Sequence, residues 1–209
     1  LAFAIVIFFL PAIKPKQSAT SYPSFREMSR SGMIIGLFSF RLALTMGRSI
    51  FFIFLPILAA DSLGLRPSLV GILLAVNILL MSLLGIPSGR IADRLNRRFL
   101  VVGGCLVSSI FLMVVPLGNT FGLLLAIAVL GSVGNAIAIP AASALEVEQG
   151  RKYGMGSSIA LFSMVSSIGM VVGPIIGGAI ADSAGINSAF HFGVTILLVG
   201  AGLFAWFSR

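Results

Sequence analysis

The chain has 209 residues, of which 58% are hydrophobic and only 10% are charged, and its mean hydropathy is +1.11. Soluble domains of this length do not reach such values, so the composition predicts an integral membrane protein. The net charge of +8 does not indicate a nucleic-acid partner, because the basic residues lie in short segments between apolar runs and not on one water-facing surface.

Residue types that carry catalysis or hold metals are scarce. The single cysteine, Cys105, has no partner for a disulfide, and the single histidine, His191, lies near the start of the last apolar run. The sequence contains no phosphate-binding loop, no cluster of metal ligands and no pairing of a nucleophile with a base. We therefore predict that the protein is not an enzyme, uses no cofactor or metal, and does not pump with ATP.

Two segments precede the first complete apolar run. Residues 1–13 are apolar up to Pro11 and are typical of the end of a transmembrane helix that begins before Leu1. Residues 14–31 are polar, with several Ser, Pro, Lys and Arg, and predict a linker.

Six apolar runs follow, each near the length of about 20 residues that a membrane-spanning helix needs. They cover residues 33–60, 67–88, 99–117, 121–145, 154–181 and 189–207. The sequence therefore predicts an all-α transmembrane bundle over residues 32–209.

Basic residues gather on one side of this predicted bundle. If the helices alternate in direction, the segments between them that face the other side carry only Arg66. Since basic residues mark the cytoplasmic side, we predict that the linker and the C-terminus are cytoplasmic, in the inner membrane of a prokaryotic cell. The basic residues of this side are Lys14, Lys16, Arg26, Arg30, Arg90, Arg94, Arg97, Arg98, Arg151, Lys152 and Arg209.

The segment between the second and third runs carries four arginines and one carboxylate, which cannot lie in hydrocarbon. A glycine ends the second run, an Asp-Arg pair follows four residues later, and a basic doublet opens the third run. This pattern resembles the loop signature of the major facilitator superfamily. Asn96 stands where the family has a second glycine, and Asn tolerates a left-handed turn better than other non-glycine residues. The matching residues are Gly89, Asp93, Arg94, Arg97 and Arg98.

The resemblance extends over almost the whole chain. It implies the C-terminal half of such a transporter, from the end of helix six through helix twelve. Such a half is a six-helix bundle of two inverted three-helix repeats, and the two halves rock about a central site. The resemblance thus implies three partners: the lipid bilayer, a small-molecule substrate and the N-terminal six-helix half of the same polypeptide.

The fifth run contains a glycine pattern, GxxxGPxxGG, that is similar to one in helix five of the superfamily's drug exporters. Here it falls in the symmetry-related helix eleven. Glycines four residues apart let a neighbouring helix approach closely, and the proline favours a bend. Gating and ordinary close packing both stay open as interpretations. The residues are Gly169, Gly173, Pro174, Gly177 and Gly178.

Arg41 and Arg48 lie in the first run, seven residues apart and hence on one helical face, with Thr45 between them. An arginine at mid-membrane costs about 2.5–3.5 kcal/mol on insertion scales, so it needs water, protein or a ligand. The resemblance implies that helices seven and ten line the substrate cavity, which makes Arg48, Thr45 and Asn135 candidate substrate contacts. A structural partner of Arg48 in the other half is the alternative. We expect Arg41 to reach the headgroups and Asn77 to form an interhelical hydrogen bond.

Two glutamates, Glu146 and Glu148, close the fourth run. We predict that they pair with arginines of the signature loop and form a cytoplasmic latch, with a solvated loop as the alternative. The partners are Arg94, Arg97 and Arg98. Asp61, Asp93 and Asp182 all lie at helix ends, so a proton-coupling carboxylate is expected in the other half.

The sequence thus predicts a secondary transporter that moves a small solute by alternating access. Proton-coupled efflux of small amphipathic compounds is the leading activity, because of the glycine pattern and the aromatic residues Phe51, Phe52 and Phe54. Organic-anion transport through Arg48 and a non-transporting, half-size membrane scaffold stay open as alternatives.

Overall fold

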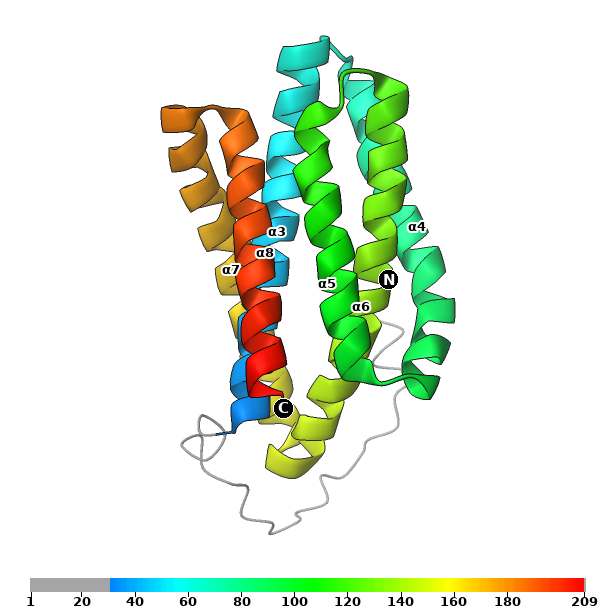
Figure 1. Cartoon of the computed structure of the whole chain (residues 1–209), viewed down its shortest axis with the longest axis vertical. Coiled ribbons are helices and arrows are strands. Elements are labelled where there is room, and N and C mark those ends of the chain that lie inside the picture. Colours follow the sequence, from blue (N-terminus) through cyan, green and yellow to red (C-terminus); the bar gives the residue numbers. More distant parts are fainter. Residues whose placement is uncertain (1–30, 209) are drawn as a thin grey trace, which may run out of the picture.

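The computed structural model describes residues 31–208 as a bundle of long helices that run side by side (Figure 1). No residue of that range lies in a strand. The segment predicted as a helix end, 1–13, and the predicted linker up to residue 30 lie outside the described residues, as does Arg209. The elements are α3 (Gly32–Leu63), α4 (Pro67–Arg94), α5 (Arg97–Val114), η1 (Val115–Leu117), α6 (Phe121–Tyr153), α7 (Met155–Ala184) and α8 (Ile186–Phe207).

Six of these helices are long and apolar enough to cross a membrane, counting α5 and η1 as one continuous span. The shortest span has 21 residues, which at 1.5 Å per residue covers roughly the 30 Å of the hydrocarbon core. The prediction of an all-α bundle of six spanning helices is confirmed for the described part of the chain.

Two helices continue past the predicted spans at one end of the bundle, which we call the basic end. It carries Arg90, Arg94, Arg97, Arg98, Arg151 and Lys152. α4 continues to Arg94, and α6 continues to Tyr153 before Gly154, with φ 101°, ends it. A helix satisfies its own backbone and can leave the hydrocarbon intact, and basic residues in the last turn of α6 favour it further. The placement of Glu146 and Glu148 at the helix end, next to a loop, was therefore wrong.

Asn96 has a different role from the one its sequence position suggested. Only Leu95 and Asn96 separate α4 from α5, and Asn96 has φ −66°, outside the left-handed region. Its side chain accepts a hydrogen bond of 3.0 Å from the backbone N–H of Arg98. Asn96 is thus the N-cap of α5, which explains why the third span begins there.

The packing between the first three helices and the last three is symmetric. α3 packs mainly on α7 and α8, while α6 packs mainly on α4 and α5. The first helix of each group of three, α3 or α6, thus packs on the other two helices of the opposite group. Two inverted three-helix repeats are expected to pack in this way.

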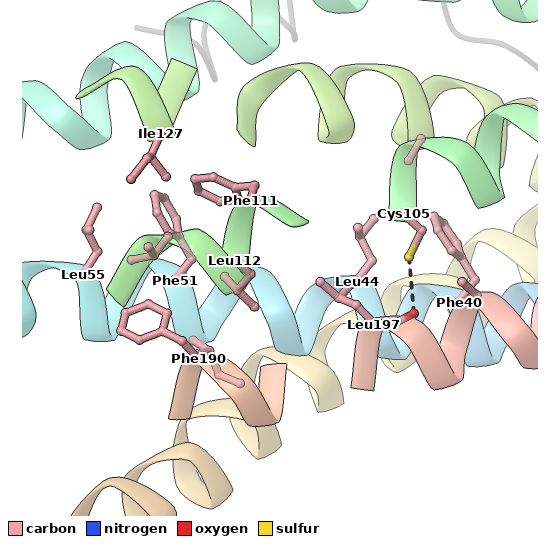
Figure 2. Close-up of a cluster of buried hydrophobic side chains, with 14 of the residues drawn as sticks. Phe40, Leu44, Phe51, Leu55, Cys105, Phe111, Leu112, Ile127, Phe190 and Leu197 are labelled. Carbon is pink, nitrogen blue, oxygen red and sulfur yellow. Dashed lines mark hydrogen bonds between the residues drawn. The ribbon is translucent and has the colours of Figure 1, made fainter. Parts of the chain in front are cut away.

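Large apolar side chains fill the space between α3, α5, α6 and α8 (Figure 2). The rings of Phe51 and Phe111 meet edge to face, with their centroids 4.9 Å apart. The buried Cys105 thiol donates a hydrogen bond of 3.4 Å to the carbonyl of Leu197. Because α4 and α7 contribute few residues to this core, their apolar surfaces stay largely exposed.

The glycine pattern of α7 lies against α3. A Cβ added at Gly173 would lie 2.6 Å from the Ser49 Oγ and 2.9 Å from the Met46 Cα, and one at Gly177 would lie 3.0 Å from the Phe54 ring. Gly169 is equally close to α3, whereas Gly178 faces open space and Pro174 lies inside the helix. The first three glycines therefore form a ridge that allows close contact between the two backbones.

Candidate functional site

Arg48 lies half-way along α3 and is the best-placed charge for a site within the membrane. Its Cζ lies 5.8 Å from the centroid of the Phe52 ring, a cation–π contact. The ion pairs among residues 31–208 belong to Arg41 and Arg97, so Arg48 has no carboxylate partner within the described chain. Its charge is left for solvent, a ligand or another chain segment.

Next to Arg48 is a small cavity of about 20 Å³ that four helices line with polar side chains. Arg48 comes from α3, Asn77 from α4, Ser108 from α5 and Asn135 from α6. Two predicted site residues, Arg48 and Asn135, thus line one pocket. The other walls are Leu44, Gly47, Phe51, Phe52, Phe111, Leu112 and Leu197.

Hydrogen bonding in this pocket is incomplete. The Asn77 side chain donates to the carbonyl of Ala128 at 2.8 Å, which confirms the predicted interhelical bond. Asn135 donates to the carbonyl of Gly131 in its own helix at 3.3 Å. Its Oδ1 and the Oγ of Ser108 are buried and have no hydrogen-bond partner among the described residues. Such atoms cost about 1–3 kcal/mol each unless water or a ligand binds them.

The sequence did not single out Ser108. It is one of two adjacent serines in the middle of the third span, and only its neighbour Ser109 bonds to its own helix, through the carbonyl of Cys105. The rotation of α5 decides which serine reaches the pocket, and the apolar pattern alone does not reveal that rotation.

Thr45 borders a different cavity, of about 240 Å³, between α3 and α7. Arg48 and Phe52 line both cavities, together with Ser49 and Met170 in this second one. The Thr45 hydroxyl donates to the carbonyl of Arg41 at 2.8 Å and to that of Leu42 at 3.0 Å. Arg48 therefore connects Thr45 and Asn135, which do not share a pocket.

Charged residues of the signature segment meet α6 at the basic end. Arg97 lies 3.5 Å from the Asp93 carboxylate and 3.8 Å from the Glu148 carboxylate. These side chains are exposed or nearly so, and pairs of this kind contribute at most about 1 kcal/mol each. Arg98 instead donates to the backbone carbonyl of Ser208 at the end of α8. Arg94 is exposed and Gly89 faces open space.

Glu146 does not pair with Arg94, Arg97 or Arg98. Its Oε1 lies 3.5 Å from the Nε of Arg41, and that Nε also donates to the Ser166 hydroxyl at 3.0 Å. The expectation that Arg41 reaches the headgroups was wrong. Glu146 and Glu148 are two residues apart, which corresponds to about 200° of rotation around the helix axis. Glu148 therefore faces the signature segment while Glu146 faces α3.

Within residues 31–208 no three His, Cys, Asp or Glu side chains come together as metal ligands. The described chain therefore offers a polar pocket at mid-membrane and a charged cluster at the basic end.

A bundle of two inverted three-helix repeats with polar residues at its centre is the architecture of one half of a secondary transporter. The family model of the Major Facilitator Superfamily matches residues 37–209. The chain belongs to this superfamily, and it is an integral membrane protein.

Similar proteins include Multidrug resistance protein MdtH of Aeromonas hydrophila, 30% identical over 157 residues that make up 74% of this chain and 38% of that protein. The protein of the same name from Yersinia enterocolitica is 29% identical over 163 residues, 75% of this chain and 39% of that protein. The chain thus matches less than half the length of these relatives.

Proposed function

We propose that the chain is the C-terminal half of a secondary transporter that exports small amphipathic compounds by alternating access. The observation that carries the proposal is the mid-membrane pocket, where the uncompensated Arg48, two unpaired polar atoms and the rings of Phe51, Phe52 and Phe111 lie together. Aromatic walls with a few polar groups suit compounds with apolar rings and a polar substituent, and because the cavity in this half is only about 20 Å³, the second half would complete the binding site. The names of the relatives, multidrug resistance proteins, support efflux.

The proposal includes a second half. The largely exposed apolar surfaces of α4 and α7 suit contact with an N-terminal six-helix half of the same polypeptide, or with lipid. Rocking of the two halves would open the pocket to each side in turn. The positive-inside rule favours a cytoplasmic basic end, and the bacterial relatives support a prokaryotic inner membrane.

We assign two groups of residues to the conformational change. The first is the Asp93, Arg97 and Glu148 cluster at the basic end, beside Gly89, Arg94 and Arg98, which would latch one state and release it. The second is the α7 ridge of Gly169, Gly173 and Gly177 with Pro174, whose smooth surface would let α7 bend against α3. Proton antiport is the coupling we propose.

Transport of an organic anion is the second candidate. It is favoured by Arg48, whose planar guanidinium has no carboxylate partner within residues 31–208 and suits a carboxylate of a substrate. A non-transporting scaffold is disfavoured because residues 37–209 match the family model of a superfamily of transporters.

The test uses the full-length transporter in proteoliposomes, with ethidium as an amphipathic cation and benzoate as an anion. Wild type, Arg48→Ala and the exposed control Arg66→Ala are compared. We expect wild type to export ethidium and not benzoate, and both variants to keep most of the ethidium export. Wild type that moves benzoate, with that movement abolished in Arg48→Ala only, would establish the anion activity instead. Wild type that moves neither probe would rule out both activities.

A further inference from the structure

Glu146 of α6 carries a largely buried carboxylate, and this side chain does not line the pocket around Arg48. Its side chain is only 11% exposed, and its Oε1 is buried and accepts no hydrogen bond among residues 31–208. What compensates the negative charge is the ion pair with Arg41, at 3.5 Å. The balance between the charged and the neutral form of a largely buried carboxylate depends strongly on the nearby opposite charge, which here is Arg41.

Arg41, Glu146 and Ser166 form a triangle that spans α3, α6 and α7. The Arg41 Nε donates to the Ser166 hydroxyl at 3.0 Å, and that hydroxyl donates to the carbonyl of Phe162 at 2.8 Å. Arg41 is therefore anchored to α7 independently of Glu146. Loss of the carboxylate's charge would remove the ion pair that joins α6 to α3 and would leave α3 attached to α7.

The ion pair is also the one polar contact between α3 and α6 within the described residues, and these two helices otherwise pack sparsely. By contrast, α3 is joined to α7 by the glycine ridge. Charge on Glu146 therefore influences the contact between α3 and α6, while the other contacts between the two repeats do not depend on it.

The other charged groups around α6 are already paired or distant. Arg97 of α5 contacts Asp93 of α4 and Glu148. α7 contributes the Ser166 hydroxyl and carries its one charged residue, Asp182, near its far end, and Arg151 and Lys152 lie in the last turn of α6. His191 lies near the start of α8, at the opposite end from the basic end. Arg41 is thus the cation that faces Glu146.

We propose that Glu146 binds and releases the coupling proton in this half of the transporter, and that protonation opens its ion pair with Arg41. The proton comes from water at the basic end, seven residues or about 10 Å along α6. Binding of the proton converts the carboxylate to a neutral acid. Its release restores the charged pair of Glu146 and Arg41. This rests on the proposed transport function and revises the expectation that the coupling carboxylate lies in the other half.

Infrared spectroscopy of the full-length protein in lipid tests the protonation step directly. Wild type, Glu146→Gln and Asp182→Asn are titrated, since Asp182 is an exposed carboxylate of α7 outside the triangle. We expect one component of the protonated-carboxyl C=O band to grow as the pH falls in wild type and in Asp182→Asn, and to be missing from Glu146→Gln. A band equally strong in all three would overturn the proposal.

Transport tests the coupling step in the same proteoliposomes. An imposed pH gradient should accelerate ethidium export by wild type. We expect this acceleration to be at least about tenfold smaller in Glu146→Gln. Exchange of ethidium at equal pH should persist, which shows that the variant is folded, and Glu146→Asp should keep its response to the gradient. Unchanged gradient dependence in Glu146→Gln would sink the inference. If wild type moves no ethidium, the transport proposal fails, whereas the infrared band still decides whether Glu146 binds a proton.

Discussion

Arg48 faces an aromatic ring where a buried arginine would ordinarily face a carboxylate. Its cation–π contact with Phe52 is worth about 0.5–2 kcal/mol, whereas placing arginine at the centre of a spanning helix costs about 2.5–3.5 kcal/mol. The ring alone does not offset that cost. The remaining cost must be offset by contacts of Arg48 with what fills the two cavities that it lines, namely water, the substrate or the other half.

The cavity between Ser108 and Asn135 is expected to hold one water molecule, because about 20 Å³ is enough for one and two unpaired polar atoms line it. Ser108→Ala and Asn135→Leu should each lower the stability of the full-length protein by about 1 kcal/mol. The double variant should lose less than the sum, since both act through the same water. Thermal unfolding in detergent measures this.

Ser109→Ala is the control for that cycle, because the Ser109 hydroxyl bonds within its own helix. Combined with Asn135→Leu, it should give losses that simply add. Additive losses for Ser108 and Asn135 as well would mean that the cavity is dry.

At the scale of the helices, glycine decides where two backbones meet. Gly173 sits where a Cβ would contact both the side chain of Ser49 and the backbone of Met46, while Gly178, five residues later, faces open space. The sequence marks both as members of one pattern. Only the rotation of α7 distinguishes the glycine in the interface from the one outside it.

Gly173→Ala is therefore expected to destabilise the protein by about 1–3 kcal/mol, since the backbone of α3 must move to make room. Gly178→Ala should be neutral or slightly stabilising, because alanine favours the helix over glycine by about 0.5–1 kcal/mol. Melting temperatures of the two variants decide the matter. Equal melting temperatures would contradict the close contact of α7 with α3.

At the scale of the whole molecule, the inverted repeats and the basic end give the bundle two chemically different ends. Arg97, Arg98, Arg151 and Lys152 lie at one end, whereas the segment between η1 and α6 at the other carries Gly118, Asn119 and Thr120. Such an asymmetry fixes the orientation of the whole bundle during insertion.

That orientation predicts the labelling of single cysteines by a membrane-impermeant maleimide in whole cells. In a full-length protein without other reactive cysteines, Asn119→Cys should label from outside, and Lys152→Cys only after permeabilisation. The native Cys105 is fully buried and serves as an unreactive background. The reverse pattern would show that the basic end faces outward.

Contacts between helices account for what the sequence left open at the site. Arg48 and Asn135 could be singled out because a polar residue deep in an apolar run is visible in the sequence itself. The Arg41 contact with Ser166 joins residues 125 positions apart, and the cavity joins four helices. Neither has a local signal, because each depends on how neighbouring helices are rotated about their axes.

The sequence alone determined that residues 33–207 hold six membrane-spanning helices, that the basic residues between these helices gather at one end and that the signature segment joins two spans. Hydropathy and charge are properties of consecutive residues, so they are readable without a fold. The tertiary structure decided that Glu146 faces Arg41 while Glu148 faces Arg97, and that Ser108 completes the pocket of Arg48. These choices depend on helix rotation and packing, which only the assembled bundle fixes.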